Sequence, residues 1–92
     1  MRLLNTSTFK LKTFYDLRTR PRYIVFSHVW NEDEVSFQDI QAEETFIRHP
    51  GYPKVRNFCR LAEELGYQWV WDDTCCIDKS SSADLSEAIN GM

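Results

Sequence analysis

The residues whose types and spacing suit a functional site lie in an acidic segment that carries two thiols. Asp73, Cys75, Cys76 and Asp78 lie close together and directly follow the apolar run at residues 69–71. In open parallel α/β sheets, ligands bind beyond the carboxyl ends of strands, where loops and helix N-termini bring polar groups together. We therefore expect this loop to face a ligand.

A second polar group follows another apolar run, at residues 23–27. An indole can stack on a base, carboxylates can accept ribose hydroxyls, and the amides of a helix N-terminus can meet phosphate. The alternative is structural: the indole lies in the core, the Ser and His satisfy backbone groups, and the aspartates cap turns. The nucleotide-binding candidates are Ser27, His28, Trp30, Asp73 and Asp78.

Other chemistries have less support in the residues. Vicinal Cys75 and Cys76 lack the two-residue spacer of zinc or thioredoxin pairs, so the sequence predicts no metal site. A nucleophile pair of Cys75 with His28 is conceivable, but only Lys79 supplies a nearby cation and a buried, unreactive thiol is favoured. All three glycines are isolated, so no glycine-rich phosphate loop is present. The sequence therefore predicts no catalytic residue.

The elements that would position these loops form a β-strand, helix, β-strand unit. Residues 23–27 are a continuous β-branched and aromatic run, typical of a strand buried on both faces, and residues 69–71 form a second such strand. Between them Val55, Phe58, Cys59, Ala62 and Leu65 make one apolar helical stripe, which begins near Pro53 and ends at Gly66. A parallel sheet with flanking helices is expected.

The two ends of the chain add a hairpin and a helix. Alternating apolar residues at 2–4 and 9–13 predict a short, half-exposed hairpin or edge. Ser81 and Asp84 form a variant capping box before a stripe of Leu85, Ala88, Ile89 and Met92. Because this stripe needs a surface and the sheet has unpaired edges, we expect residues 1–92 to be part of one domain, truncated before its C-terminal half.

Composition limits the remaining classes. The chain has 92 residues, a net charge of −3 and scattered basic residues, which excludes a strong nucleic-acid footprint. No secretory signal or long apolar segment is present, and three cysteines without disulfide spacing fit reduced thiols. We expect a cytoplasmic protein without membrane contact or a tightly bound cofactor.

Three segments resemble a known family: YIVFSHVW at residues 23–30, VSFQDI at 35–40, and WDDTCCIDKSSSADLSEAIN at 71–90. Together they resemble the N-terminal part of the fungal heterokaryon incompatibility (HET) domain. The resemblance implies an incomplete flavodoxin-like α/β fold related to TIR domains, which acts in non-self recognition and cell death. It also implies that NAD is a substrate of the intact domain, and that homotypic HET or TIR-like domains are partners.

The sequence departs from the family pattern at three positions. Val29 stands where Thr is usual, Asn31 where Gly is usual, and Asp72 where the family has an apolar residue. A carboxylate at Asp72 must reach water, find a partner or raise its pKa. The family's presumed catalytic Glu falls in a segment that this chain does not contain, so we expect no NAD cleavage by this chain alone. The alternative is a small non-enzymatic interaction module that regulates full-length relatives.

Overall fold

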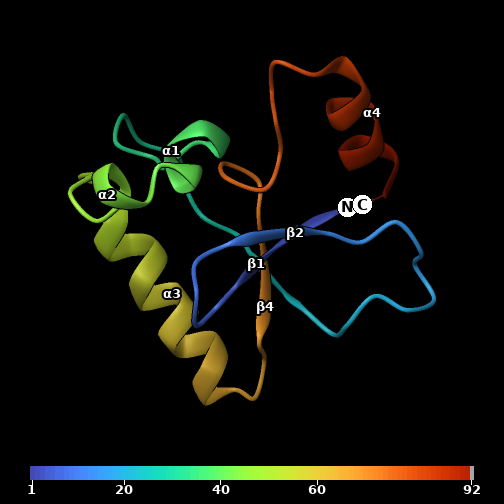
Figure 1. The fold of residues 1–92 in the computed structure, drawn as a ribbon, viewed down its shortest axis with the longest axis horizontal. Coiled ribbons are helices and arrows are strands. Elements are labelled where there is room, and N and C mark those ends of the chain that lie inside the picture. The colour runs from blue at the N-terminus through green and yellow to red at the C-terminus, as the bar shows by residue number, and fades with distance from the viewer. Residues whose placement is uncertain (92) are drawn as a thin grey trace.

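A computed structural model describes the backbone of residues 1–91 and the side chains of residues 1–86. A four-stranded open sheet carries helices on its flanks, so the fold is mixed α/β (Figure 1). In chain order the elements are β1 (Arg2–Asn5), β2 (Leu11–Thr13), β3 (Ile24–Phe26), α1 (Phe37–Gln41), α2 (Glu43–Phe46), α3 (Tyr52–Glu64), β4 (Trp69–Asp72) and α4 (Ser82–Gly91).

The sheet has the order β2-β1-β4-β3. β3 and β4 are parallel, with Val25 opposite Trp71, and they are joined through α3, as the sequence predicts. The expected hairpin of β1 and β2 is also present. However, β1 also runs antiparallel to β4, with Leu4 opposite Val70, so the hairpin joins the expected parallel pair in one mixed sheet.

The predicted burial of β3 and the predicted half-exposure of β1 are wrong, whereas β4 is buried as expected. Among the described residues β3 is an edge strand, and Val25 is 48% exposed. A run of β-branched residues is compatible with burial on both faces, but no described element packs on the outer side of Val25. The interior position belongs instead to β1, whose Leu3 and Leu4 are fully buried although its hairpin was expected to be half-exposed.

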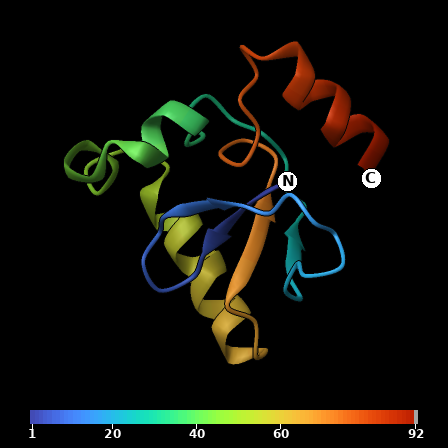
Figure 2. The same ribbon diagram turned by 45° about the vertical axis from the view of Figure 1, so that its right-hand side comes forward.

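Helix α3 covers one face of the sheet, and α4 begins on the other side of the end of β4 (Figures 1 and 2). Val55, Cys59 and Ala62 of the predicted stripe are buried, but Leu65 at its end is 57% exposed. Leu65 is exposed because it is the C-cap of the helix, where the chain turns away through Gly66 at φ 88°.

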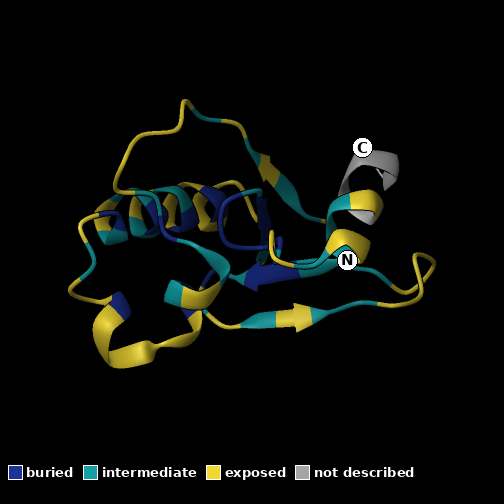
Figure 3. Ribbon diagram, turned by 90° about the horizontal axis from the view of Figure 1, so that it is seen from above, coloured by how far each residue is buried: buried dark blue, intermediate teal, exposed yellow. Residues whose placement is uncertain are grey.

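The core lies between α3 and the sheet (Figure 3). α3 also contacts β3 through the stacked rings of Phe58 and Phe26, whose centroids are 4.0 Å apart. The segment at residues 35–40 leads into helix α1, whose start is capped by Ser36 and Asp39 in a capping box. Ala88, Ile89 and Met92 of the C-terminal stripe lie outside the described side chains.

At the start of α4 the predicted cap is half present. The Asp84 amide donates to Ser81 Oγ at 3.2 Å, but the Asp84 carboxylate accepts from the Asp78 amide at 3.1 Å instead of the Ser81 amide. Asp84 also pairs with Arg2 of β1. This ion pair attaches the N-terminus of α4 to the sheet. No helix among the described residues is long and apolar enough to cross a membrane.

Candidate functional site at the ends of β3 and β4

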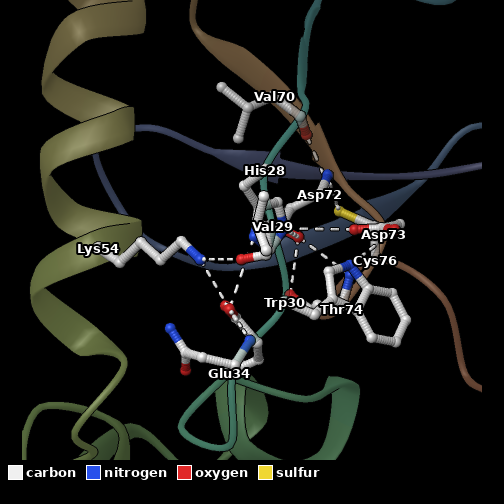
Figure 4. Close-up of polar contacts among 11 residues, drawn as sticks. His28, Val29, Trp30, Glu34, Lys54, Val70, Asp72, Asp73, Thr74 and Cys76 are labelled. Carbon is white, nitrogen blue, oxygen red and sulfur yellow. Dashed lines mark hydrogen bonds and ion pairs between the residues drawn. The ribbon is translucent and has the colours of Figure 1, made fainter.

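His28 lies at the centre of a polar cluster where the two parallel strands end (Figure 4). Its Nε2 atom is 3.2 Å from Asp72 Oδ1 and 3.3 Å from Asp73 Oδ1, and its side chain is only 5% exposed. Because β3 and β4 run in the same direction, the residues that follow them meet at one edge of the sheet. The strand pairing therefore positions the cluster.

Packing fixes the orientation of the imidazole. The ring of Phe26, two residues earlier, lies 4.3 Å from the His28 ring between centroids, and Phe26 itself stacks on Phe58 of α3. Helix α3 thus sets the position of His28 through an aromatic column. The imidazole packs against the Phe26 ring while its two nitrogens face carboxylates.

Asp72, a buried carboxylate at a position where the sequence departs from the pattern of the family it resembles, has hydrogen-bond partners. Its side chain is 2% exposed, and Oδ1 accepts hydrogen bonds from the Thr74 amide at 3.0 Å and the Thr74 hydroxyl at 2.7 Å. With His28, these donors offset the cost of removing the charge from water. Asp72 belongs to the cluster even though Asp73 was the expected carboxylate.

Trp30 lies at the solvent side of the cluster and is 51% exposed, which excludes the alternative that it belongs to the core. Its Nε1 atom donates to Asp73 Oδ2 at 3.2 Å. The Lys79 ammonium lies 3.3 Å from the centroid of the indole ring, close enough for a cation–π interaction. The indole is therefore held at its edge by Asp73 and approached over one face by a cation.

Glu34, in the loop after β3, and Lys54, on α3, complete the site. Glu34 Oε2 accepts from Lys54 Nζ at 2.7 Å and from the Asn31 amide at 3.0 Å, and it lies 3.6 Å from His28 Nδ1. Lys54 also donates to the Val29 carbonyl at 3.1 Å. Burial raises the pKa of Glu34, but the hydrogen bonds from Lys54 and Asn31 outweigh it, so that the pKa is lowered. These contacts tie the loop after β3 to α3.

The structure thus brings three of the five candidates together: His28, Trp30 and Asp73. Ser27 is exposed, and no contact joins it to the cluster among the described residues. Asp78 accepts from the Ser80 hydroxyl and amide, which lower its pKa, and from Gln38 at 3.4 Å. Asp78 therefore caps a turn beside the cluster, as the structural alternative for it predicts.

Three members of the site are not among the candidates predicted from the sequence: Asp72, Glu34 and Lys54. Asp72 was noticed only as an anomaly, although an acidic residue in a buried strand is itself a signal of a polar partner. No local pattern in the sequence distinguishes Glu34 or Lys54, because acidic loop residues and helix lysines are ordinary on protein surfaces. Their roles depend on how α3 packs.

The vicinal cysteines Cys75 and Cys76 are buried in the loop that follows β4. Cys76 Sγ accepts from the Asp72 amide at 3.4 Å and lies 3.9 Å from the Val70 carbonyl, so it contacts the backbone at the end of β4. The neighbouring Cys76 thiol and burial raise the pKa of Cys75 well above its ordinary value. All three cysteines are free, which agrees with the expectation of reduced, unreactive thiols.

A separate cavity lies on the side of the sheet where α4 begins. Its volume is about 560 Å³, and its walls include Phe14, Tyr23, Trp71 and the Arg2–Asp84 ion pair. These walls are mainly apolar and aromatic. The cavity can take an apolar group, but the groups suited to polar chemistry gather at His28.

Comparisons with known proteins agree on one family. Residues 23–92 match the family described as "Heterokaryon incompatibility protein (HET)". The chain is 43% identical over 74 residues to the vegetative incompatibility protein HET-E-1 of Podospora anserina. That match covers 78% of this chain and 5% of the relative, so the chain spans a small part of that protein's length. No solved structure matches the chain.

Proposed function

Because this chain belongs to the heterokaryon incompatibility (HET) family, we propose that its cluster at the ends of β3 and β4 recognises a nicotinamide dinucleotide within an incompatibility domain. In this proposal the domain adopts a flavodoxin-like, TIR-like arrangement and acts in the cytoplasm in non-self recognition leading to cell death. The observation that carries the proposal is the half-exposed indole of Trp30 joined to Asp73 beside a buried His28.

The charges of the site favour one orientation of such a ligand. Glu34, Asp72 and Asp73 would repel phosphate, but carboxylates are good acceptors for ribose hydroxyls. A flat ring can stack on the indole face if it displaces the Lys79 ammonium, which lies over that face. The proposal therefore places a ribose and ring at the cluster and the phosphates toward Lys79.

Titration of NAD⁺ into the 92-residue chain, followed by isothermal calorimetry, tests the proposal. A matched pair of variants separates the site from general effects: Trp30→Ala removes the platform, and Tyr15→Ala removes a ring that is 92% exposed outside the cluster. We expect Trp30→Ala to weaken binding by about 5- to 150-fold, since base stacking on an aromatic side chain contributes roughly 1–3 kcal/mol. Equal affinities of the two variants would exclude the proposed site.

The edge of the sheet favours a second candidate function, a non-enzymatic interaction module. Strand β3 has an unpaired edge among the described residues, and such edges can accept a strand from another chain. The partner would be a second HET domain. Sedimentation of the chain with an intact HET domain tests this idea, and pairing that survives Val25→Pro, which blocks strand addition, would contradict it.

A further inference from the structure

The imidazole of His28 has carboxylates at both of its nitrogens. Nε2 faces Asp72 and Asp73 at 3.2 and 3.3 Å, and Nδ1 faces Glu34 at 3.6 Å. A neutral imidazole carries a proton on only one nitrogen. One buried lone pair therefore points at a carboxylate unless the ring is doubly protonated or a metal cation lies between the two groups.

Two atoms of the cluster are buried without a hydrogen-bond partner among the described residues: His28 Nδ1 and Asp73 Oδ1. The His28 side chain is 95% buried, since its exposed fraction is 5%. Buried polar atoms in native proteins almost always have a partner, and an exception calls for an ion, a water or a functional role. The cluster thus has both excess negative charge and unsatisfied atoms.

The geometry of the same atoms fits a metal ion. One ligand atom from each of His28, Asp72 and Asp73 can be chosen so that all three lie within 4.8 Å of one another. Tetrahedral Zn²⁺ with bonds of about 2.0–2.1 Å places neighbouring ligand atoms about 3.3 Å apart. The two nitrogen-to-oxygen distances of 3.2 and 3.3 Å agree with that spacing. We propose that His28, Asp72 and Asp73 bind a divalent transition-metal ion such as Zn²⁺ or Mn²⁺.

The surroundings supply what a metal site of this kind needs. With Nε2 bound to the metal, the ring proton lies on Nδ1 and faces Glu34, the carboxylate–histidine–metal arrangement common in metalloproteins. Trp30 donates to Asp73 and Thr74 donates to Asp72, so both ligand carboxylates are oriented by hydrogen bonds (Figure 4). The two ligand carboxylates therefore have hydrogen-bonded outer partners, and His28 Nδ1 faces the Glu34 carboxylate 3.6 Å away.

The donor set also selects the kind of ion. Two carboxylates balance the charge of a divalent cation, and the imidazole nitrogen favours Zn²⁺ over Mg²⁺ or Ca²⁺, which prefer oxygen, while the two carboxylates also suit Mn²⁺. Three protein ligands leave one tetrahedral position open, as in catalytic zinc sites. Metal binding needs no nucleotide and is measured without one, so it can fail or succeed independently of the proposed function.

NMR of the imidazole nitrogens distinguishes a metal from a proton. The chain has two histidines, so His49→Gln leaves the His28 signals alone in the spectrum. Long-range ¹H–¹⁵N spectra of this variant are recorded in metal-free buffer and after adding ZnCl₂. We expect Nε2 to move to the range of a metal-bound nitrogen while Nδ1 stays protonated. Spectra in which both nitrogens keep their metal-free shifts at saturating Zn²⁺ would overturn the proposal.

Calorimetry with ZnCl₂ and MnCl₂ provides the matched comparison. Asp73→Asn removes a ligand charge at a partly exposed position, and Glu64→Gln removes the same charge on the exposed surface of α3. We expect Asp73→Asn to weaken binding by more than about tenfold, since even outer-shell partners contribute 10- to 100-fold to metal affinity. Glu64→Gln should leave it unchanged. Equal affinities for both variants would show that metal binds elsewhere, including at the thiols.

Discussion

His28 Nε2 lies 3.2 Å from Asp72 Oδ1, and the two side chains are 5% and 2% exposed. This buried pair connects the loop after β3 to the last residue of β4. It also accounts for an acidic residue at a strand position where an apolar one was expected. The pair is therefore both a structural link and the base of the candidate site.

Removal of the Asp72 carboxylate should destabilise the fold. Asp72→Ala leaves His28 and Thr74 without their partner, and breaking a buried pair typically costs about 3–5 kcal/mol. Urea unfolding followed by tryptophan fluorescence measures the loss. If Asp72→Ala does not fold, Asp72→Asn, which keeps the shape, should show a smaller loss of the same sign. Glu64→Ala on the surface should change stability by less than about 0.5 kcal/mol, and an equally small effect of both Asp72 variants would contradict the account.

The pairing of Lys54 with Glu34 should make stability depend on pH. The pKa of Glu34 is lowered from its ordinary value of 4.5, so its contribution is fully present above that value and is lost as pH falls through the lowered pKa. Lys54→Met should cost about 1 kcal/mol at pH 7. The difference from the unaltered chain should shrink below pH 4.5. Unfolding curves across this range test it, and a difference independent of pH would show that the lysine acts only through packing.

Two glycines should respond differently to alanine. Gly66 has φ 88° with open space around it, so Gly66→Ala should cost about 1–2 kcal/mol through backbone strain alone. At buried Gly51 an added Cβ would clash with the Asp33 carbonyl and meet Val35 at 3.1 Å, which forces the chain before α3 to move. Gly51→Ala should therefore be the more destabilising substitution in thermal unfolding. The reverse order would show that the approach of residues 33–35 to α3 is not tight.

The thiols should be protected in the folded chain. Burial, together with nearby Glu63 and Asp72, raises the pKa of Cys59 to about 12, and Cys75 and Cys76 are almost fully buried. Since the thiolate is the reactive form, the reaction with Ellman's reagent at pH 8 should be slow and become fast in urea. Rapid labelling of Cys75 in the folded chain would contradict this prediction and support a nucleophilic or redox role for Cys75.

Local patterns predicted the elements whose signals are local. Pro53 and Gly66 mark the start and end of α3, and the β3–α3–β4 unit with its parallel strands follows from the order of apolar runs. Burial was harder to predict, because it depends on which strand takes the interior position. The insertion of β1 beside β4 is a long-range pairing that short-range periodicity does not encode.

The residues of the candidate site were also predictable only in part. The rule that ligands bind at the carboxyl ends of parallel strands located His28, Trp30 and Asp73. Glu34 and Lys54 join the site because the loop after β3 packs on α3, and no sequence motif predicts this packing. Asp72 was visible as an anomaly, but its role requires the distance to His28.

The most direct test of the central claim, that a nucleotide is recognised at the ends of β3 and β4, is an NMR titration with NAD⁺. The chain has three tryptophans, so one spectrum reports on three indole N–H groups. The account predicts that the Trp30 indole signal, now bonded to Asp73, shifts progressively while those of Trp69 and Trp71 remain in place. Unchanged Trp30 with a shifting Trp71, which lines the cavity near α4, would contradict it and move the ligand to the other side of the sheet.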